Sequence, residues 1–305
     1  MAFPEYVIMP ASRVDLLAHS PAVEAVSSVR DLPSRSVGFV DSFFPGWSAA
    51  YGLEGISGPD ALMNRYYRQL MDVSGIERVW DWRYKLEDRD LGAVKPMLDL
   101  LNVRFYLDYP GGRRAPREML SPFSSSDMEV YESRSYWPRA FFTDSIAVYR
   151  DLPQYWSWIR AGDGRPFAAI EHGDWDRLNP LPAISGDLST RRINPARDYV
   201  LTANTTSFTV DATGPGLIVL TEAYERGNFR ATLNGVDVPY SRVNHAFKGI
   251  FVGSAGRYTV RFSYWPDGFS ITLVVMGMGI LVVLVGLSLV LLTSKTPPLS
   301  RPFEI

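Results

Sequence analysis

Residues 269–293 read FSITLVVMGMGILVVLVGLSLVLLT and contain no Asp, Glu, Lys or Arg. An α-helix of this length extends about 37 Å, against about 30 Å for the hydrocarbon core of a bilayer. Tyr264 and Trp265 precede the stretch, and amphipathic aromatic residues favour the membrane–water interface. The alternative, a core helix of a soluble protein, rarely runs this long without a charge. The sequence therefore predicts one transmembrane helix at 269–293.

The charges that flank this stretch do not orient it. Lys295 and Arg301 follow it, whereas Arg257 and Arg261 precede it, so the positive-inside rule favours neither side. The two preceding arginines are candidates for contact with lipid headgroups. The first ten residues, MAFPEYVIMP, lack the basic and apolar regions of a signal peptide. Two interpretations stay open: a tail-anchored protein with a cytoplasmic body, or an extracytoplasmic body translocated by membrane helices absent from this chain.

Upstream of the membrane stretch, the hydrophobic pattern has a period of two. Apolar and polar side chains alternate in YTVRFSY (258–264), and GLIVLTEAY (216–224) is another strand-like run. Asn234-Gly235 separates FRATL from VDV and supplies the positive φ values of a type I′ hairpin turn. About six or seven such short strands favour a small antiparallel β-sandwich at 196–268.

The first 150 residues mix helical and strand patterns. Leu62, Tyr66, Leu70 and Val73 fall on one face of a helix that Pro59-Asp60 opens. A second helix, interrupted by Pro96, is predicted at 91–101, and strands are predicted at 36–44, 78–86, 102–109, 127–132 and 139–149.

The fold class predicted from these patterns is α+β. A mixed α/β N-terminal unit at 1–150 is followed by a connector at 151–195, which carries a candidate helix at 152–159. The antiparallel β-sandwich at 196–268 comes next, then the C-terminal transmembrane helix at 269–293 and a short polar tail at 294–305.

Composition excludes several functions. With 31 basic and 33 acidic residues and no long run of one sign, nucleic acid is not an expected partner. The absence of cysteine excludes disulfides, thiolate metal sites and a Cys nucleophile. His19, His172 and His245 are too scattered for a zinc site. No phosphate-binding loop or nucleophile elbow is present, so no cofactor, metal or catalytic residue is predicted.

The best candidate binding surface joins the loop Tyr51-Gly52-Leu53-Glu54 to the helix that bears Asn64, Arg65 and Arg68. Aromatic faces and short polar groups suit sugars, and arginine suits phosphate, so Tyr51, Glu54, Asn64, Arg65 and Arg68 are the predicted substrate-binding residues. The alternative is that Tyr51 and Leu53 pack into the core and the arginines are solvated.

Two other groups carry a weaker functional interpretation. Trp80, Trp82 and Tyr84 share one side of a predicted strand, where they form either a sugar platform or part of the core. The run EHGDWD (171–176) is either a cation or acid–base site or a solvated acidic loop.

Five segments resemble, in order, the extracytoplasmic C-terminal region of the YfhO-like family of bacterial membrane proteins, which is related to polytopic GT-C-type glycosyltransferases. The segments are YGLEGISGPDALMNRYYRQLM (51–71), MLDLLNVRFYL (97–107), VYESRSYWPRAFF (130–142), the long run from GPGLIVLTEAY to GIFV (214–252), and AGRYTVRFSYWPDGF (255–269). The closing helix matches the family's last membrane span. The resemblance covers nearly the whole chain from about residue 35.

This chain departs from the family pattern in two places. Glu54-Gly55 replaces a Leu-Glu-Asp-type sequence, and the run 224–229 replaces Tyr-Pro-Gly-Trp-like residues, so no ligand contact is carried over from the family at these positions. The family's many N-terminal membrane helices, with their acidic catalytic loop, are also absent.

The resemblance implies a cell-membrane, single-pass, extracytoplasmic domain of a GT-C-type system that is not catalytic alone. Such a domain would cap or position a lipid-linked sugar or an envelope glycan acceptor. The lipid bilayer and a polytopic membrane protein are its implied partners. The alternative is a non-enzymatic scaffold that binds glycan or another envelope protein. The sugar, the lipid carrier and the acceptor are not specified by the sequence.

Overall fold

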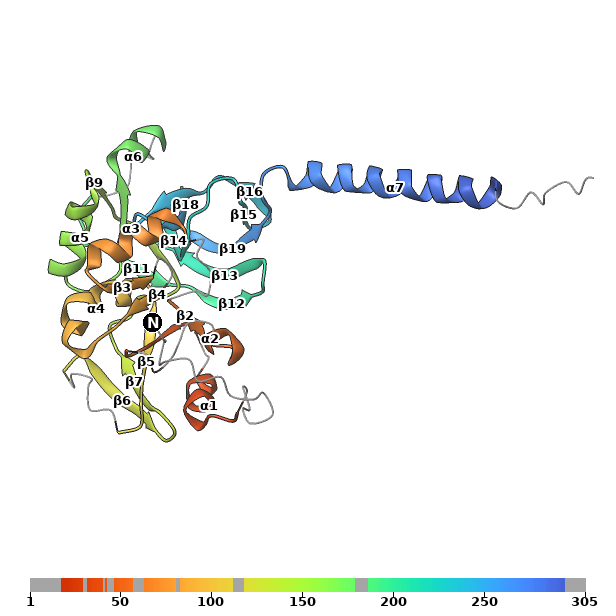
Figure 1. The fold of residues 1–305 in the computed structure, drawn as a ribbon. Helices are drawn as coiled ribbons and strands as arrows, with labels where there is room; N and C mark the ends of the chain where they lie inside the picture. The colour runs from red at the N-terminus through yellow and green to blue at the C-terminus, as the bar shows by residue number, and fades with distance from the viewer. Residues whose placement is uncertain are drawn as a thin grey trace, which may run out of the picture.

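A computed structural model describes residues 18–29, 32–40, 42, 47–56, 63–80, 83–111, 118–178 and 186–293. It shows a layered head from which one long helix, α7 (Phe269–Thr293), projects away (Figure 1). The fold is α+β with sandwiched antiparallel sheets and a C-terminal apolar helix, as predicted.

The N-terminal sheet mixes parallel and antiparallel pairing. Its strand order is β2-β1-β5-β7-β6, in which β2, β1 and β5 are parallel and β5, β7 and β6 antiparallel. The strands are β1 (Arg35–Gly38), β2 (Glu54–Gly55), β5 (Val103–Asp108), β6 (Leu120–Ser125) and β7 (Glu129–Ser133). Two short helices accompany them, α1 (Pro21–Ser28) and α2 (Trp47–Ala50). The side chains of Val23 and Val26 on α1 pack against Phe105 and Val130 on one face of this sheet.

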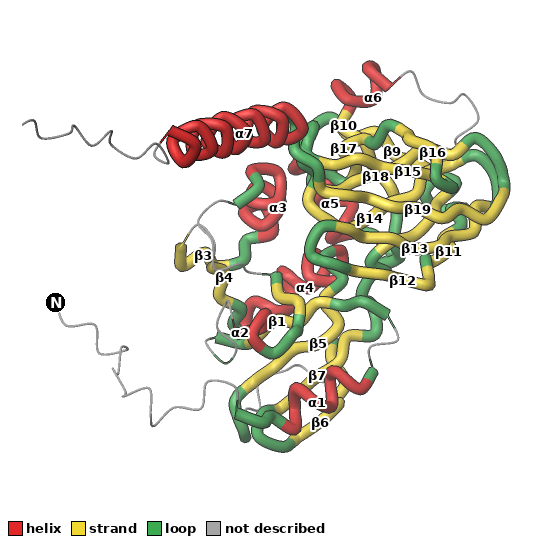
Figure 2. Tube along the Cα trace, turned by 90° about the vertical axis from the view of Figure 1, so that its right-hand side faces the viewer, coloured by secondary structure: helices red, strands yellow, loops and turns green. Residues whose placement is uncertain are grey.

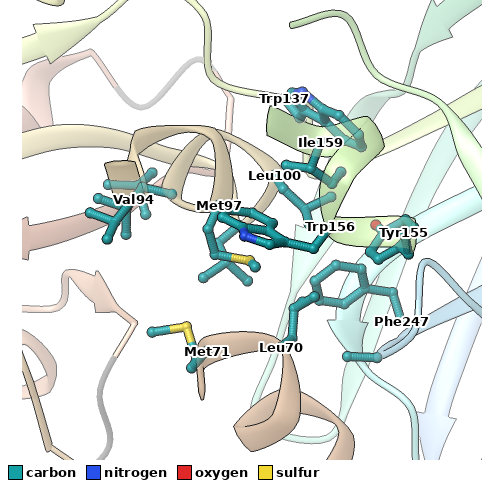
Figure 3. Packing of buried hydrophobic residues seen from close by; sticks show 14 of the residues in the cluster. Leu70, Met71, Val94, Met97, Leu100, Trp137, Tyr155, Trp156, Ile159 and Phe247 are labelled. Atoms are coloured by element: carbon teal, nitrogen blue, oxygen red, sulfur yellow. The ribbon is translucent and has the colours of Figure 1, made fainter. Parts of the chain in front are cut away.

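Three helices share the main core with the opposite face of this sheet, and the second of them packs directly against β5. They are α3 (Arg65–Ser74), α4 (Leu91–Leu100) and α5 (Leu152–Ala161), and a 3₁₀ turn at Asp88–Asp90 precedes α4. Figure 3 shows Leu70 of α3, Met97 of α4 and Tyr155 of α5 converging in one buried cluster with Phe247 from the sandwich. Because this largest cluster joins the helices to strands of the sandwich, the two halves of the head share one core.

Three predictions for the first 150 residues need correction. The stretch 78–86 forms a small antiparallel hairpin, β3 (Glu77–Trp80) and β4 (Arg83–Lys85), instead of one strand. The stretch 139–149 is also split, into β8 (Ala140–Thr143) and β9 (Ile146–Tyr149), which belong to different sheets. Finally, α4 continues through Pro96, because its buried side chains hold the helix against the core despite the lost backbone hydrogen bond.

The sandwich consists of two five-stranded sheets. The outer sheet has the order β12-β13-β19-β15-β16, and the central sheet the order β11-β8-β14-β18-β17 (Figure 2). The outer strands are β12 (Arg197–Leu201), β13 (Thr205–Ala212), β15 (Phe229–Leu233), β16 (Val236–Val238) and β19 (Gly256–Tyr264). Besides β8, the central strands are β11 (Ile193–Pro195), β14 (Gly216–Ala223), β17 (Ser241–Val243) and β18 (Phe247–Val252). Two of the central strands, β8 and β11, come from residues before 196.

The predicted hairpin is confirmed. Ala231 pairs with Val238 and Leu233 with Val236, so Asn234 and Gly235 form the two-residue turn. Their φ values are +52° and +82°, as a type I′ turn requires. Gly and Asn adopt positive φ at the lowest cost, which is why these two residues set the register here.

The central sheet is buried on both faces. In β14, Ile218 and Leu220 face the outer sheet, whereas Leu217 and Val219 face the core beneath the helices. The sheet is therefore the middle layer of the head, and this double burial explains why its sequence is continuously apolar instead of alternating.

Residues 151–178 and 186–195 are folded into the head. Besides α5 they provide β10 (Ala168–Glu171) and α6 (His172–Leu178), and β10 pairs in parallel with β9. The buried Asn244 links β10 to the central sheet: its amide oxygen accepts from Ala169 N at 2.6 Å and its Nδ2 donates to Phe167 O at 2.9 Å.

Four residues separate β19 from helix α7, which runs 25 residues with no buried side chain. It is long and apolar enough to cross a membrane once. A fully exposed helix of this composition would be insoluble in water, so single-pass membrane anchoring accounts for it.

Candidate functional site

A cleft of about 700 Å³ lies where the N-terminus of α3 meets the loop after β14, α6 and β17. We call it the tyrosine cleft. It is lined by Met63, Asn64, Arg65, Tyr66, Asp174, Tyr224, Glu225, Arg226, Tyr240, Ser241 and Arg242. A neighbouring hollow of about 850 Å³ shares four of these residues and extends to Gln69 and His245. The two hollows form one continuous surface depression.

Asn64 closes one end of the tyrosine cleft. As the N-cap of α3, it accepts with Oδ1 from the backbone amides of Tyr66 and Tyr67 at 2.9 and 3.0 Å. Its Nδ2 donates to Tyr224 O at 2.8 Å and to Glu225 Oε1 at 2.6 Å. One side chain therefore caps the helix and joins it to the loop after β14, which are 160 residues apart in sequence.

Three tyrosines form the aromatic wall. The ring centroids of Tyr66 and Tyr224 lie 6.5 Å apart, and those of Tyr224 and Tyr240 lie 5.6 Å apart. Burial raises the pKa of Tyr224 and of Tyr240, so both hydroxyls stay protonated at neutral pH. Partly exposed tyrosine rings offer an apolar face with a polar edge, as sugar-binding sites use.

Arg242 organises the floor of the cleft. Its Nε donates to Asp174 Oδ2 at 3.0 Å and its Nη2 to Glu171 Oε2 at 2.5 Å. The guanidinium lies 4.3 Å from the centroid of the Tyr66 ring. Burial acts to lower the pKa of Arg242, but the two carboxylates outweigh it and the pKa is raised. Arg242 is therefore a permanently charged group that forms ion pairs with both Glu171 and Asp174.

Two exposed arginines face the cleft without an ion pair to any described residue. Arg65 donates to the Tyr66 hydroxyl at 2.8 Å and stacks 4.6 Å from that ring. Arg226 lies on the opposite loop. Their guanidiniums can bind an anionic group such as phosphate by charge-assisted hydrogen bonds.

The loop that carries Tyr224 and Arg226 also contacts the base of α7. Trp265 N donates to Asn228 O at 2.8 Å. Gly227, at φ +76°, lies so close to the Asp267 carboxylate that a Cβ there would overlap it. The loop that lines the tyrosine cleft is thus held next to the point where the chain enters the apolar helix.

His245 lies behind the Tyr66 ring, 6% exposed and also at positive φ (+66°). Its Nε2 is 3.0 Å from Gln69 Oε1, and its Nδ1 is 3.4 Å from the Tyr149 hydroxyl. Burial, followed by the nearby Arg242 charge, lowers the pKa of His245 to about 4. The imidazole is therefore neutral at pH 7.

This lowered pKa predicts acid destabilisation. The stability that neutral His245 contributes is fully present above the unfolded-state pKa of 6.5. It is lost as the pH falls towards the folded-state pKa of about 4, because in this range the unfolded chain binds the proton and the folded chain does not. Between pH 7 and pH 5 the free energy of unfolding should fall by about 2 kcal/mol from this residue. Urea unfolding of the full chain in detergent, followed by tryptophan fluorescence, measures this loss.

The control is His245→Asn, since asparagine tolerates positive φ. It should lower stability at pH 7 but flatten the decline between pH 7 and pH 5. An equally steep decline in the variant would assign the pH dependence to other groups.

The structure separates the five predicted site residues. Asn64 and Arg65 lie in the tyrosine cleft. Arg68, one turn later, is 3.7 Å from Asp72 on the same helix. Tyr51 packs against the small cluster under α1 and donates to Ala18 O at 3.1 Å. Glu54 forms an ion pair with the buried Arg139. Tyr51 and Glu54 thus have structural partners away from the cleft.

Several cleft residues were not identified from the sequence as binding residues. They are Tyr66, Asp174, Tyr224, Arg226, Tyr240 and Arg242. Tyr66 carried a helical-face signal and Asp174 belonged to the acidic run 171–176, but nothing local marks either as facing Tyr224. That run contributes Glu171 and Asp174 to the ion pairs of Arg242.

The remaining candidates are structural within the described residues. Tyr84 is 7% exposed and donates to Met63 Sδ at 3.2 Å, which places it in the core, while Trp82 and the Trp80 side chain lie outside the described residues. Across the described part of the chain, no three His, Asp or Glu side chains converge to hold a metal ion.

Comparison with family models, curated proteins and solved structures found no match to this chain.

Proposed function

We propose that this chain is the membrane-anchored, extracytoplasmic head of a YfhO-like, GT-C-type glycosyltransferase system. In this role it positions a lipid-linked sugar or an envelope glycan acceptor for a polytopic partner that performs the chemistry. The observation that supports this most directly is the tyrosine cleft, whose aromatic wall and unpaired arginines lie beside the base of α7. A sugar with a phosphate close to a membrane has this chemical profile.

The arrangement of acids in the cleft favours binding over catalysis. Glycoside chemistry uses two carboxyl groups, one of which must donate or accept a proton freely. Here Glu171 and Asp174 both receive hydrogen bonds from Arg242. Glu225 accepts from Asn64 at 2.6 Å. Each of these carboxylates, among the described residues of the cleft, thus accepts a hydrogen bond from a neighbouring side chain.

Ligand-observed saturation-transfer NMR tests the proposal on the full chain in nanodiscs. Glucose 1-phosphate and N-acetylglucosamine 1-phosphate serve as probes. Tyr224→Ala removes the middle ring and Arg226→Gln removes an unpaired cation. Each should weaken binding about tenfold, since stacking on an aromatic ring and a charged hydrogen bond are each worth about 1–3 kcal/mol.

Matched controls lie outside the cleft. Tyr109→Ala removes a tyrosine that is 46% exposed, and Arg197→Gln removes an exposed arginine on the outer sheet. Both should bind the probes as the unaltered chain does. Equal saturation transfer in all five proteins would remove the cleft from the proposed function.

A further inference from the structure

The connection between the head and α7 is short and folded. Only Trp265 to Gly268 separate β19 from α7. Trp265 N donates to Asn228 O at 2.8 Å, Phe269 N donates to Pro266 O at 3.0 Å, and Trp265 Nε1 donates to Ser270 Oγ at 3.0 Å. Even fully extended, four residues span at most about 14 Å, and these hydrogen bonds shorten the connection further.

This length limits how far the head can stand from a bilayer. The polar layer on each side of the hydrocarbon core is about 5–8 Å thick, since a bilayer of about 40–45 Å has a core of about 30 Å. If Phe269 lies at the edge of the hydrocarbon, the connection of at most about 14 Å has to cross this headgroup layer of about 5–8 Å first. Little of its length is then left to lift the end of the sandwich nearest α7 above the headgroups. That end must therefore lie in or directly on the headgroup layer.

The residues at this end suit that environment. The turn at 202–204 lies beside Tyr264, whose backbone N donates to Asn204 O at 2.8 Å. Leu201 and Tyr264 are 40% and 45% exposed. Apolar and aromatic side chains that remain exposed next to a membrane helix favour the interface.

Two cations flank this apolar rim. The Arg230 guanidinium stacks 5.0 Å from the Trp265 ring, and Arg226 is exposed on the adjoining loop. Neither is paired with a carboxylate among the described residues. Asp267 is the one acidic side chain of the connection, and it lies just before the first turn of α7, where the helix dipole favours a negative charge. By contrast, Arg257 lies at the far end of β19, 3.6 Å from Asp198.

We infer that this end of the sandwich, formed by Leu201, the turn at 202–204, Tyr264, Arg226 and Arg230, is a second membrane contact that seats the head on phospholipid headgroups. The inference rests on the proposed membrane anchoring by α7 and adds a fixed orientation of the head. Seated in this way, the loop that carries Arg226 places one wall of the tyrosine cleft at headgroup level.

The absence of cysteine from the chain permits a clean test. Ala203 lies in the turn nearest α7, and Ala255 lies in another exposed turn at the opposite end of the sandwich. The β13–β19 ladder between them runs from the Thr205–Ser263 pair to the Ala212–Gly256 pair, seven steps, or about 23 Å. Ala203→Cys and Ala255→Cys therefore report on two ends of one sheet with matched residues.

Each variant of the full chain is spin-labelled and placed in phosphatidylglycerol-containing vesicles. Collision with a water-soluble nickel chelate and with oxygen then reports the depth of each label. We expect nickel accessibility at Ala203→Cys to be at least threefold lower than at Ala255→Cys. Adding Arg226→Gln and Arg230→Gln should reduce the difference in nickel accessibility between the two labels. Tryptophan fluorescence checks that the head of this variant stays folded.

A third label, Val283→Cys in the middle of α7, separates the possible failures. If that label is shielded from nickel and the labels at 203 and 255 are equally accessible, the head is not seated and the inference is wrong, although anchoring stands. If the label at 283 is itself accessible to nickel, α7 is not in lipid and the anchoring in the proposed function is wrong as well. If the nickel accessibility of the label at 203 is unchanged in the double arginine variant, the two cations do not take part in the membrane contact.

Discussion

Leu217→Ala and Ile218→Ala should destabilise the protein to a similar extent, although they are adjacent residues on one strand. Each should cost about 2–5 kcal/mol, the usual range for truncating a fully buried Leu or Ile to Ala. Their exposures are 0% and 1%, and they face opposite sides of β14. In a plain two-layer sandwich, one of two adjacent residues would face solvent and its truncation would cost little. Thermal and urea unfolding of the full chain in detergent measure both effects.

The outer sheet provides the control. Side chains of β13 alternate between buried and partly exposed, and Phe208 is 1% exposed while its neighbour Ser207 points away from the core. Phe208→Ala should cost about 3–5 kcal/mol, whereas Ser207→Ala should stay within about 0.5 kcal/mol. A small effect at either Leu217 or Ile218 would mean that the central sheet has one open face.

Glu54→Gln should cost about 3 kcal/mol, because removal of one partner leaves the buried charge of Arg139 uncompensated. Arg139 is 2% exposed and its guanidinium forms an ion pair with Glu54. A second cation, the partly buried Arg35, lies nearby: desolvation, together with the Arg139 charge, lowers the pKa of Arg35 to about 10. The figure is at the lower end for a broken buried pair, since the Glu54 side chain is 47% exposed and partly screened by water.

Asp211→Asn is the matched control for this loss. Arg197 and Asp211 form an ion pair at 2.7 Å, but both side chains are more than 40% exposed. Breaking an exposed pair should cost less than about 1 kcal/mol. Both variants are compared by urea unfolding at pH 7. If Glu54→Gln were as mild as Asp211→Asn, water would have to solvate Arg139, and the ion pair would not explain why Glu54 occupies this position.

The elements that could be predicted from the sequence are those specified by short-range chemistry. The Asn234-Gly235 hairpin follows from the φ values that these two residues tolerate, and α7 follows from length and the absence of charge. The alternation in β19 also holds, with Val260 and Phe262 buried and Arg261 exposed. Errors arose where partners are distant, as at 139–149, where β8 joins the central sheet and β9 pairs with β10.

The candidate site shows the same division. Asn64 and Arg65 were proposed because sugars and phosphates favour short polar groups and arginine, which are visible in sequence, and the structure places both in the tyrosine cleft. Tyr51 and Glu54 were grouped with them by nearness along the chain, but their partners are Ala18 and Arg139. Tyr224 lies where Asn64 joins α3 to the loop after β14, and the Tyr240 hydroxyl donates to Glu225 O on the same loop.

By itself, the sequence determined the α+β class, the strand-rich second half and the apolar helix at 269–293, since each depends on residues close together in the chain. Only the tertiary structure decided that the central sheet is covered on both faces and that a tyrosine cleft lies beside the base of α7. Burial and ion pairing depend on which surfaces meet, and contacts such as Asn64 with Tyr224 join residues 160 positions apart. The local sequence shows whether a side chain is apolar or charged, but which residue that side chain contacts depends on the fold.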